Sequence, residues 1–510
     1  MFPNSKIGDE KYVVDDNAII SAGFLNWLKK TPSSTALFIS DKSYSYQELF
    51  KYANTVYQKI KHLKDECIGV QCADNIESYV NILAVSFLGA AYLPLNNKFP
   101  IERIAKIAED AKLKHVICFN DDFQKKLSNE VNIIYPDYSL LGQINQIEHI
   151  DFSIFNSQIS YILYTSGSTG EPKGVPVSRK NINSFFNYYL NEYSFNNTDR
   201  FLQPYELSFD VSVFSMFCAW NCGASVYVVP DKINKPIEII KMIRDYHLTV
   251  VSMVPGVLQL IEKYLPELHL PSVNYSFFSG DALKHDLAIK WKNCIPNAVI
   301  HNFYGPTETT IVCSKYEWEL KKSEKEIRNN IVPIGKLFAN HEAILLDENG
   351  NCFYERGRAG ELCISGDQVI ESYLNNKDAH RFFKFNQKVF YKTGDWVELN
   401  EYGNFVFLGR TDEQVKINGF RVELTEIEHA IYEKYSLTNK VIAVELNKIV
   451  QLVAFILKPA DGLKTPNQFD LKLPSYMIPK KIIYINAFPL NPNGKIDRFQ
   501  LKKIAIENEQ

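Results

Sequence analysis

Residues 161–174 read YILYTSGSTGEPKG and form the most distinctive segment of the sequence. A β-like run, Tyr161 to Tyr164, leads into seven residues of which six are Thr, Ser or Gly, and Lys173 follows. Small residues let backbone N–H groups approach an anion closely, hydroxyls add donors, and a lysine adds a point charge. The spacing is neither GxxxxGK[ST] nor GxGxxG. The segment predicts a phosphate-binding loop, with an ordinary surface loop as the alternative.

Strand-like and helical runs alternate on both sides of this loop. The runs 115–119, 225–230 and 249–254 are strand-like, and 237–247 places apolar residues at helical spacing. This alternation indicates an α/β fold with buried parallel sheets. Between about 335 and 410 the pattern changes to short strands joined by DENG and EYGN turns, which predicts a β-rich subdomain.

The last hundred or so residues have a different order of elements. The segment 409–431 predicts a turn, a strand and then a helix capped around Thr425, with Glu428 three residues on. The run QLVAFILKP (451–459) predicts a further strand. We expect a small α+β module here, and the alternative is that this tail packs as part of one body.

Composition limits the class of protein. A chain of 510 residues predicts two or three domains, and 56 Lys+Arg against 59 Asp+Glu give no electrostatic reason to expect a nucleic-acid partner. Nine scattered cysteines without CxxC pairs favour a reducing compartment. The apolar stretch 80–95 predicts a buried helix followed by a turn, too short to span a membrane, and the N-terminus lacks a signal-peptide pattern. We expect a cytoplasmic protein without a membrane partner.

The loop and eight other segments resemble, in order, the core motifs of the adenylate-forming superfamily of acyl-CoA synthetases, firefly luciferase and nonribosomal peptide adenylation domains. The resemblance covers nearly the whole chain. It implies a large N-terminal α/β region of two subdomains with the β-rich one, residues 1–411, and a small hinged α+β domain, residues 412–510, with Asp412 at the hinge. The eight segments are SYSYQELF (43–50), GAAYLPLNNKFPIERI (89–104), SFDVSVF (208–214), NFYGPTETT (302–310), GELCISG (360–366), YKTGDW (391–396), GRTDEQVKINGFRVEL (409–424) and NPNGKID (491–497).

The resemblance also implies a reaction and its residues. A carboxylate attacks the α-phosphorus of ATP and expels pyrophosphate, helped by positioning and by charge neutralisation. Glu308 is implied to ligate Mg²⁺ and Thr307 to donate to the α-phosphate. Tyr304 is implied to stack on adenine, Asp395 to accept from the ribose hydroxyls, and Lys495 to reach the reacting groups. The other implied ATP-binding residues are Thr165, Ser166, Gly167, Ser168, Thr169, Gly170, Lys173, Gly280, Asp281, Ala282, Asn302, Gly305 and Arg410.

Asp210 points to the substrate class. In amino-acid-activating members of the superfamily this carboxylate faces the substrate ammonium, which would be costly to bury unpaired; the alternative is that Asp210 is a helix N-cap. The pocket has no acidic or basic residue besides Asp210 and Lys495, so we expect a small or compact apolar amino acid such as alanine, glycine, proline or valine, with serine possible. The resemblance implies further lining by Val211, Phe214, Ser252, Phe277, Ser279, Phe303, Ile311 and Val312.

The acceptor is expected to be a thiol. No condensation-type segment precedes the first motif and no carrier module follows the last, so we expect a free-standing enzyme similar to D-alanine–carrier protein ligases, acting on a phosphopantetheinyl carrier protein in trans. In the family the strand with Gly419 lines the pantetheine tunnel. The rivals are an acyl-CoA or aryl-CoA ligase, against which Asp210 argues, an amide ligase, and an inactive homologue that serves as a binding protein.

Overall fold

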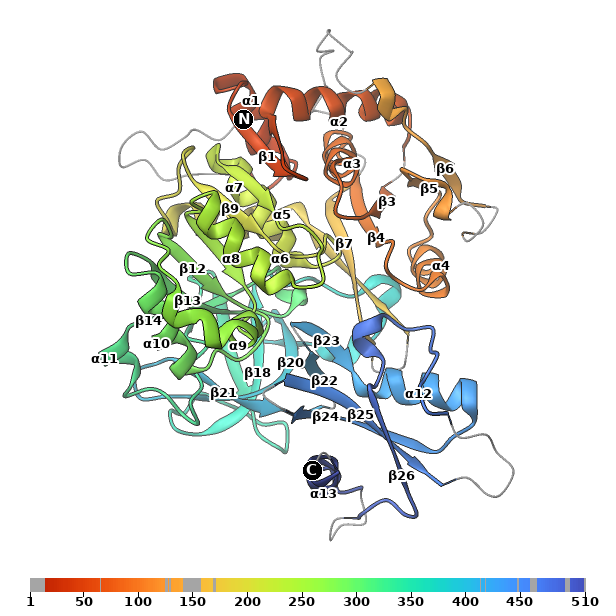
Figure 1. The fold of residues 1–510 in the computed structure, drawn as a ribbon, viewed down its shortest axis with the longest axis vertical. Coiled ribbons are helices and arrows are strands. Elements are labelled where there is room, and N and C mark those ends of the chain that lie inside the picture. Colours follow the sequence, from red (N-terminus) through yellow and green to blue (C-terminus); the bar gives the residue numbers. More distant parts are fainter. Residues whose placement is uncertain are drawn as a thin grey trace.

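The computed structural model describes residues 14–64, 66–123, 127, 130–140, 157–167, 171–412, 414–417, 419–446, 449–458, 466–490 and 496–508. Two sheets of mainly parallel strands form the upper part of the molecule in Figure 1, and the C-terminal elements, drawn in blue, lie beneath them. Within the described ranges, every helix is too short or too polar to cross a lipid bilayer.

The first sheet has nine strands in the order β15-β14-β13-β12-β11-β9-β10-β1-β2. From β13 to β1 all neighbours are parallel, so their carboxyl ends meet at one edge. In open α/β sheets this edge is where ligands bind. The strands are β1 Thr35–Ile39, β2 Lys42–Ser45, β9 Arg200–Gln203, β10 Ser225–Val228, β11 Val250–Met253, β12 Tyr275–Phe278, β13 Val299–Tyr304, β14 Ser314–Trp318 and β15 Lys336–Leu337.

The second sheet has six strands in the order β6-β5-β3-β4-β7-β8, and only β8 is antiparallel to its neighbour. The phosphate loop therefore connects the antiparallel pair β7 and β8. The strands are β3 Cys67–Cys72, β4 Ala91–Asn96, β5 His115–Ile117, β6 Asn132–Ile134, β7 Ile159–Thr165 and β8 Lys173–Ser178.

The apolar stretch 80–95 is only partly as expected. Its first part lies in the buried helix α3, Ile76–Phe87, but after the turn at Gly89 the chain forms β4, whose residues are all buried. The predicted buried helix and turn are confirmed, but the strand β4 that follows the turn was not predicted. A strand covered on both faces is a continuous apolar run without alternation, so its sequence does not distinguish it from a buried helix end.

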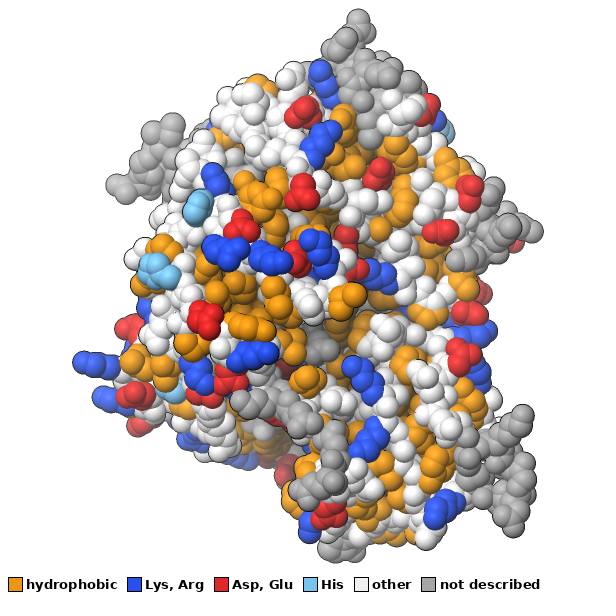
Figure 2. Space-filling model, viewed as in Figure 1, with side chains coloured by type: hydrophobic (Ala, Val, Ile, Leu, Met, Phe, Trp, Pro, Cys, Tyr) orange, Lys and Arg blue, Asp and Glu red, His pale blue; other side chains and the backbone are white. Residues whose placement is uncertain are grey.

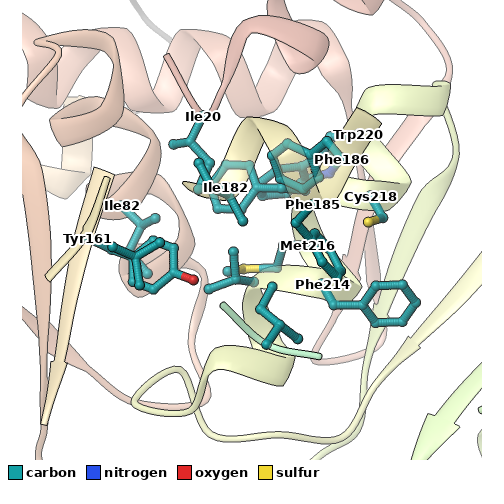
Figure 3. Packing of buried hydrophobic residues seen from close by; sticks show 14 of the residues in the cluster. Ile20, Ile82, Tyr161, Ile182, Phe185, Phe186, Phe214, Met216, Cys218 and Trp220 are labelled. Atoms are coloured by element: carbon teal, nitrogen blue, oxygen red, sulfur yellow. The ribbon is translucent and has the colours of Figure 1, made fainter. Parts of the chain in front are cut away.

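Helices cover both sheets and form the core between them. Figure 3 shows Ile182, Phe185 and Phe186 of α5 packed against Phe214 and Trp220, which belong to the helical segment 210–222. In that segment a π-helical turn, Phe214–Cys218, joins the short helices α6 and α7. The helices of this region are α1 Ala22–Lys30, α2 Tyr46–Ile60, α3, α4 Ile101–Asp110, α5 Arg179–Glu192, α6 Asp210–Val213, α7 Ala219–Cys222, α8 Lys235–Asp245, α9 Gly256–Ile261, α10 His285–Cys294 and α11 Leu320–Ser323.

The third sheet is antiparallel and spans the segment in which a β-rich subdomain is expected. Its order is β17-β16-β18-β20-β19, with β21 also paired to β20. The DENG turn forms as expected: the Asp347 carboxylate accepts from the backbone of Asn349 and Asn351 at 3.0 and 2.8 Å. The strands are β16 His341–Leu346, β17 Cys352–Phe353, β18 Ala359–Gly366, β19 Phe382–Phe385, β20 Lys388–Leu399 and β21 Phe405–Arg410.

The C-terminal elements are a hairpin, a three-stranded sheet and two helices. The helix cap was predicted wrongly: α12 follows β23 directly, its N-cap position is Glu423, and Thr425 lies in its first turn. Glu428 bonds to Lys440 and to the backbone of Val441 instead of closing a capping box. The domain boundary at 411/412 stays a prediction. The elements are β22 Gln414–Ile417, β23 Phe420–Glu423, α12 Leu424–Tyr435, β24 Asn439–Leu446, β25 Ile449–Leu457, β26 Lys481–Ile485 and α13 Arg498–Glu507.

Candidate active site

A cavity of about 420 Å³ lies between the carboxyl ends of the parallel strands and the β22–β23 hairpin. Ligand pockets usually have volumes of about this size. Tyr205, Ser279 and Tyr304 line it from the chain at or just after β9, β12 and β13, and Lys416 and Arg421 line it from the hairpin. Figure 2 shows hydrophobic side chains over α8 and α9, which also contribute to the lining, with basic side chains beside them.

The phosphate loop borders this cavity at the end of β7. Thr165 and Ser166 line it, and the Thr165 hydroxyl is buried without a hydrogen-bond partner among the described residues. At Gly167 a β-carbon would come within 1.9 Å of the Glu171 carbonyl oxygen, so only glycine fits there. Ser168, Thr169 and Gly170 lie outside the described residues.

Lys173 is buried at the start of β8, and its Nζ lies 2.8 Å from the Asp378 carboxylate. The cation expected to meet phosphate is therefore held by a carboxylate in this structure. An arriving phosphate would compete with Asp378 for the ammonium group.

Glu308 is fully buried in a cluster of donors. Arg421 Nη1 donates to both of its carboxylate oxygens at 3.0 and 2.9 Å, and the Tyr373 hydroxyl donates at 2.5 Å. Burial opposes ionisation of this carboxyl, but the Arg421 guanidinium and the Tyr373 hydroxyl outweigh it and lower the pKa of Glu308 to about 2. Arg421 comes from β23, so the C-terminal region supplies the counter-charge to the carboxylate expected to hold Mg²⁺.

A carboxylate of this kind suits Mg²⁺, which takes one or two carboxylates together with substrate phosphates. Among the described residues, no three His, Cys, Asp or Glu side chains gather to hold a metal on their own. Glu308 therefore fits the ion only together with phosphate oxygens, and only when Arg421 has withdrawn.

Asp395 and Tyr304 belong to a second network in the cavity wall. The Tyr304 hydroxyl donates to Asp395 at 2.5 Å, and Arg410 pairs with the same carboxylate. Arg410 Nε also lies 2.7 Å from Asp412, which Arg381 contacts at 2.9 Å. Pairing of β20 with β21 places Asp395 opposite Arg410, so Asp395, which is expected to bind ribose, is linked through Arg410 to Asp412, the expected hinge residue.

The expected adenine-binding residues divide between the cavity and its surroundings. Gly280 and Gly305 line the cavity. Asp281 accepts a hydrogen bond from the backbone of Ala282 at 2.7 Å, next to this lining. Asn302 lies behind the wall, where its amide donates to the carbonyls of Val332 and Pro333.

Asp210 lies at the first position of α6 and lines the cavity. The N-cap position is Phe209, so the alternative role of Asp210 as N-cap is wrong. Asp210 is only 8% exposed, and burial raises the pKa of its carboxyl to about 7 against the opposing hydrogen bond from Thr307. In the described part of the chain no Lys, Arg or His pairs with it. Asp210 is thus a buried acid that lines an open cavity and has no basic side chain paired with it among the described residues.

The other expected substrate-binding residues fall into two groups. Val211, Ser279 and Ile311 line the cavity with Asp210. The other five are buried outside this lining. The ring centroid of Phe277 lies 5.8 Å from that of Phe214 and 5.2 Å from that of Phe303. Ser252, on β11, and Val312 are also buried.

The residues of this site that were not predicted include Tyr205, Tyr373 and Arg421. Arg421 lies inside a segment that carries the resemblance, so its charge could have been noticed there. Tyr205 and Tyr373 lie outside the quoted motifs and have no distinguishing spacing. Lys495 lies outside the described residues; its neighbours Leu490 and Ile496 form an isolated bridge.

Comparison with known proteins shows the family to which the chain belongs. The model of the family described as AMP-binding enzyme matches residues 24–374. The chain belongs to this family. The AMP-binding enzyme described here is 31% identical over 490 residues to zwittermicin A synthase ZmaJ of Bacillus cereus, with 92% of each chain covered.

Two further relatives extend the comparison. Gramicidin S synthase 1 of Brevibacillus brevis is 31% identical over 94% of this chain, but the chain spans only 44% of that relative. Most of the curated relatives are likewise longer than this chain, which covers between 8% and 44% of them. The structure of the Vibrio cholerae adenylation domain AlmE in complex with glycyl-adenosine-5'-phosphate is 25% identical, with a TM-score of 0.80, and the match covers 98% of this chain and all of that one.

Proposed function

We propose that this AMP-binding enzyme activates a small amino acid as its aminoacyl-adenylate and transfers the aminoacyl group to the phosphopantetheine thiol of a carrier protein in trans. Asp210 carries the proposal. A buried carboxylate that faces an open cavity and has no cation partner is suited to bind a substrate ammonium group. The glycyl-adenylate bound to AlmE is a molecule of the proposed class.

In the first half-reaction the substrate carboxylate would attack the α-phosphorus of ATP, and pyrophosphate would leave. Asp210 would hold the ammonium group, and Thr165, Ser166 and Lys173 would contact phosphate oxygens. Mg²⁺ would be held by Glu308 and phosphate oxygens, where it would neutralise phosphate charge. Lys495 would approach the reacting groups as a second cation. These residues contribute by positioning and by charge neutralisation, which are the main requirements of phosphoryl chemistry.

In the second half-reaction the thiol would attack the acyl carbonyl, and AMP would leave. The β22–β23 hairpin supports this step because it lines the cavity opposite the strand ends. Gly419 has φ +85°, and a β-carbon there would lie 2.5 Å from the Val254 side chain, so only glycine lets the hairpin close against the cavity wall. In this step Arg421 would supply the counter-charge to Glu308, as it does in this structure.

An ATP–pyrophosphate exchange panel tests the first step. The panel contains both enantiomers of the small amino acids together with fatty and aryl acids, and each positive acid is then tested for thioester formation with pantetheine and with coenzyme A. We expect exchange with amino acids only. Exchange with fatty or aryl acids and none with amino acids would identify a coenzyme A ligase instead.

A further inference from the structure

We propose that Tyr205 is the specificity-determining residue that closes the side-chain end of the amino-acid site and restricts it to glycine and alanine. The inference rests on the proposed function, which it narrows. Ser252 and Phe277 are expected around the substrate side chain but do not line the cavity, whereas Tyr205, which was not expected, does line it.

Tyr205 is held in place from both ends. It follows the last residue of β9, Gln203, by two positions, and its backbone carbonyl accepts a hydrogen bond from the Gln203 side chain at 3.0 Å. Its hydroxyl lies 3.0 Å from the Ser252 hydroxyl on the neighbouring strand β11, and Ser279 also bonds to it. The backbone bond fixes where the residue starts, and rotation of the ring away from the cavity wall would break its hydroxyl bonds.

The ring lies between the cavity and the residues behind it. Tyr205 lines the cavity, whereas its hydroxyl partner Ser252 is 3% exposed and does not. Phe277 is paired with Ser252 in the β11–β12 register and is likewise buried outside the lining. The space that these two positions could offer a substrate side chain is thus closed by Tyr205.

Asp210 sets where the substrate would lie relative to this ring. Tyr205 and Asp210 line the same cavity, so an ammonium group bound to Asp210 would place the α-carbon in the space that the ring borders. A hydrogen or methyl group on that carbon would lie beside Val211 and Ile311, which line the cavity with Tyr205. A longer side chain would have to displace the hydroxyl-bonded ring, and forcing extra methylenes against packed side chains is unfavourable.

The test compares the wild-type enzyme with Tyr205→Ala and Tyr205→Phe in ATP–pyrophosphate exchange with glycine, alanine, valine, leucine and phenylalanine. We expect the wild type to prefer glycine or alanine over leucine by at least about 10-fold in kcat/KM, the lower end of what one methylene discriminates in an apolar pocket. Tyr205→Ala should raise the ratio of leucine to glycine by at least about 10-fold. Tyr205→Phe keeps the ring but loses its hydroxyl bonds, so its ratio of leucine to glycine should lie between those of the wild type and Tyr205→Ala.

Thermal unfolding of each variant shows whether it is folded, and Tyr205→Leu replaces the alanine variant if that one is not. Equal use of leucine and glycine by the wild type overturns the role of Tyr205 but leaves the proposed function standing. The role of Tyr205 is also overturned, with the proposed function intact, if folded Tyr205→Ala keeps the wild-type order. Absence of exchange with every amino acid overturns the proposed function and this inference together.

Discussion

Replacing Asp210 by asparagine should make the protein more stable and much less active. The change keeps the shape of the side chain and its ability to bond to Thr307, but it removes a charge that has no cation partner in the described part of the chain. Stability and substrate affinity should therefore move in opposite directions. A gain in stability together with a loss of activity is expected of a carboxylate that binds substrate, and not of one that stabilises the fold.

The stability change follows from the pKa. Burial raises the pKa of Asp210 from 3.8 to about 7, so the folded protein binds this proton more tightly than the unfolded chain does. Between these two values wild-type stability falls as pH rises, and above pH 7 the full cost of the buried charge is present. The difference of roughly three pKa units limits this cost to about 4 kcal/mol. Asp210→Asn should unfold at higher temperature than the wild type at pH 8, and the gain should vanish near pH 4.

The activity change follows from the lost ion pair. Removing one partner of a buried charge pair costs about 2–5 kcal/mol, which corresponds to a decrease of about 30-fold to several thousand-fold in kcat/KM for the amino acid. The assay is ATP–pyrophosphate exchange with glycine and alanine. The control is Asp231→Asn, because Asp231 lines the same cavity but is 45% exposed and pairs with Lys98 at 2.6 Å. The control should stay within about threefold of wild type, since exposed pairs contribute little.

The pH profile gives an independent check on the same carboxylate. It must be ionised to bind an ammonium group, so the wild-type kcat/KM should fall as pH drops below about 7, and the Asp210→Asn profile should lack this fall. The reasoning is refuted if Asp210→Asn keeps kcat/KM within threefold of wild type, or if it is less stable than wild type at pH 8.

Three other substitutions test the two half-reactions. Arg421→Ala leaves the buried Glu308 without its cation, which costs about 3–5 kcal/mol. Transfer of a labelled amino acid to pantetheine should therefore fall at least about 100-fold, while ATP–pyrophosphate exchange changes less than tenfold. An equal fall in both rates would contradict this role of Arg421. Gly419→Ala should also block transfer and spare exchange, whereas Gly403→Ala, with a similar φ of +76° but its nearest neighbour 3.7 Å away, should affect neither. Lys495→Ala should lower exchange by about 10²–10³ with an unchanged unfolding temperature, and wild-type exchange would exclude Lys495 from the reaction.

Much of the site could be predicted because its parts are local in sequence. The phosphate loop follows one strand, and Asp210 begins one helix. Asp395 and Arg410 face each other across two strands joined by a short turn. In each case one segment contains both the residue and the reason for its position. Short-range geometry is what residue types and their spacing encode.

Local patterns misled where two structures share one pattern. The strand β4 after the turn was not predicted, because it is buried on both faces and a short apolar run without alternation does not identify itself as a strand. Thr425 with Glu428 has the form of a capping box, but β23 runs directly into α12 and Glu428 bonds to β24 instead. A cap depends on how the preceding chain approaches the helix, which the tertiary structure sets.

The sequence by itself determined the class of fold, and through its resemblance to the superfamily it predicted the phosphate loop and the role of Asp210. Only the tertiary structure decided which side chains meet from distant segments: Arg421 pairs with Glu308 across 113 residues, and Tyr205 reaches Ser252 across 47. Such contacts depend on how separate elements pack, and nothing in the sequence around Arg421 or Tyr205 indicates which distant residue it will contact. The charge of Glu308 and the size of the substrate site are therefore properties of the packed molecule.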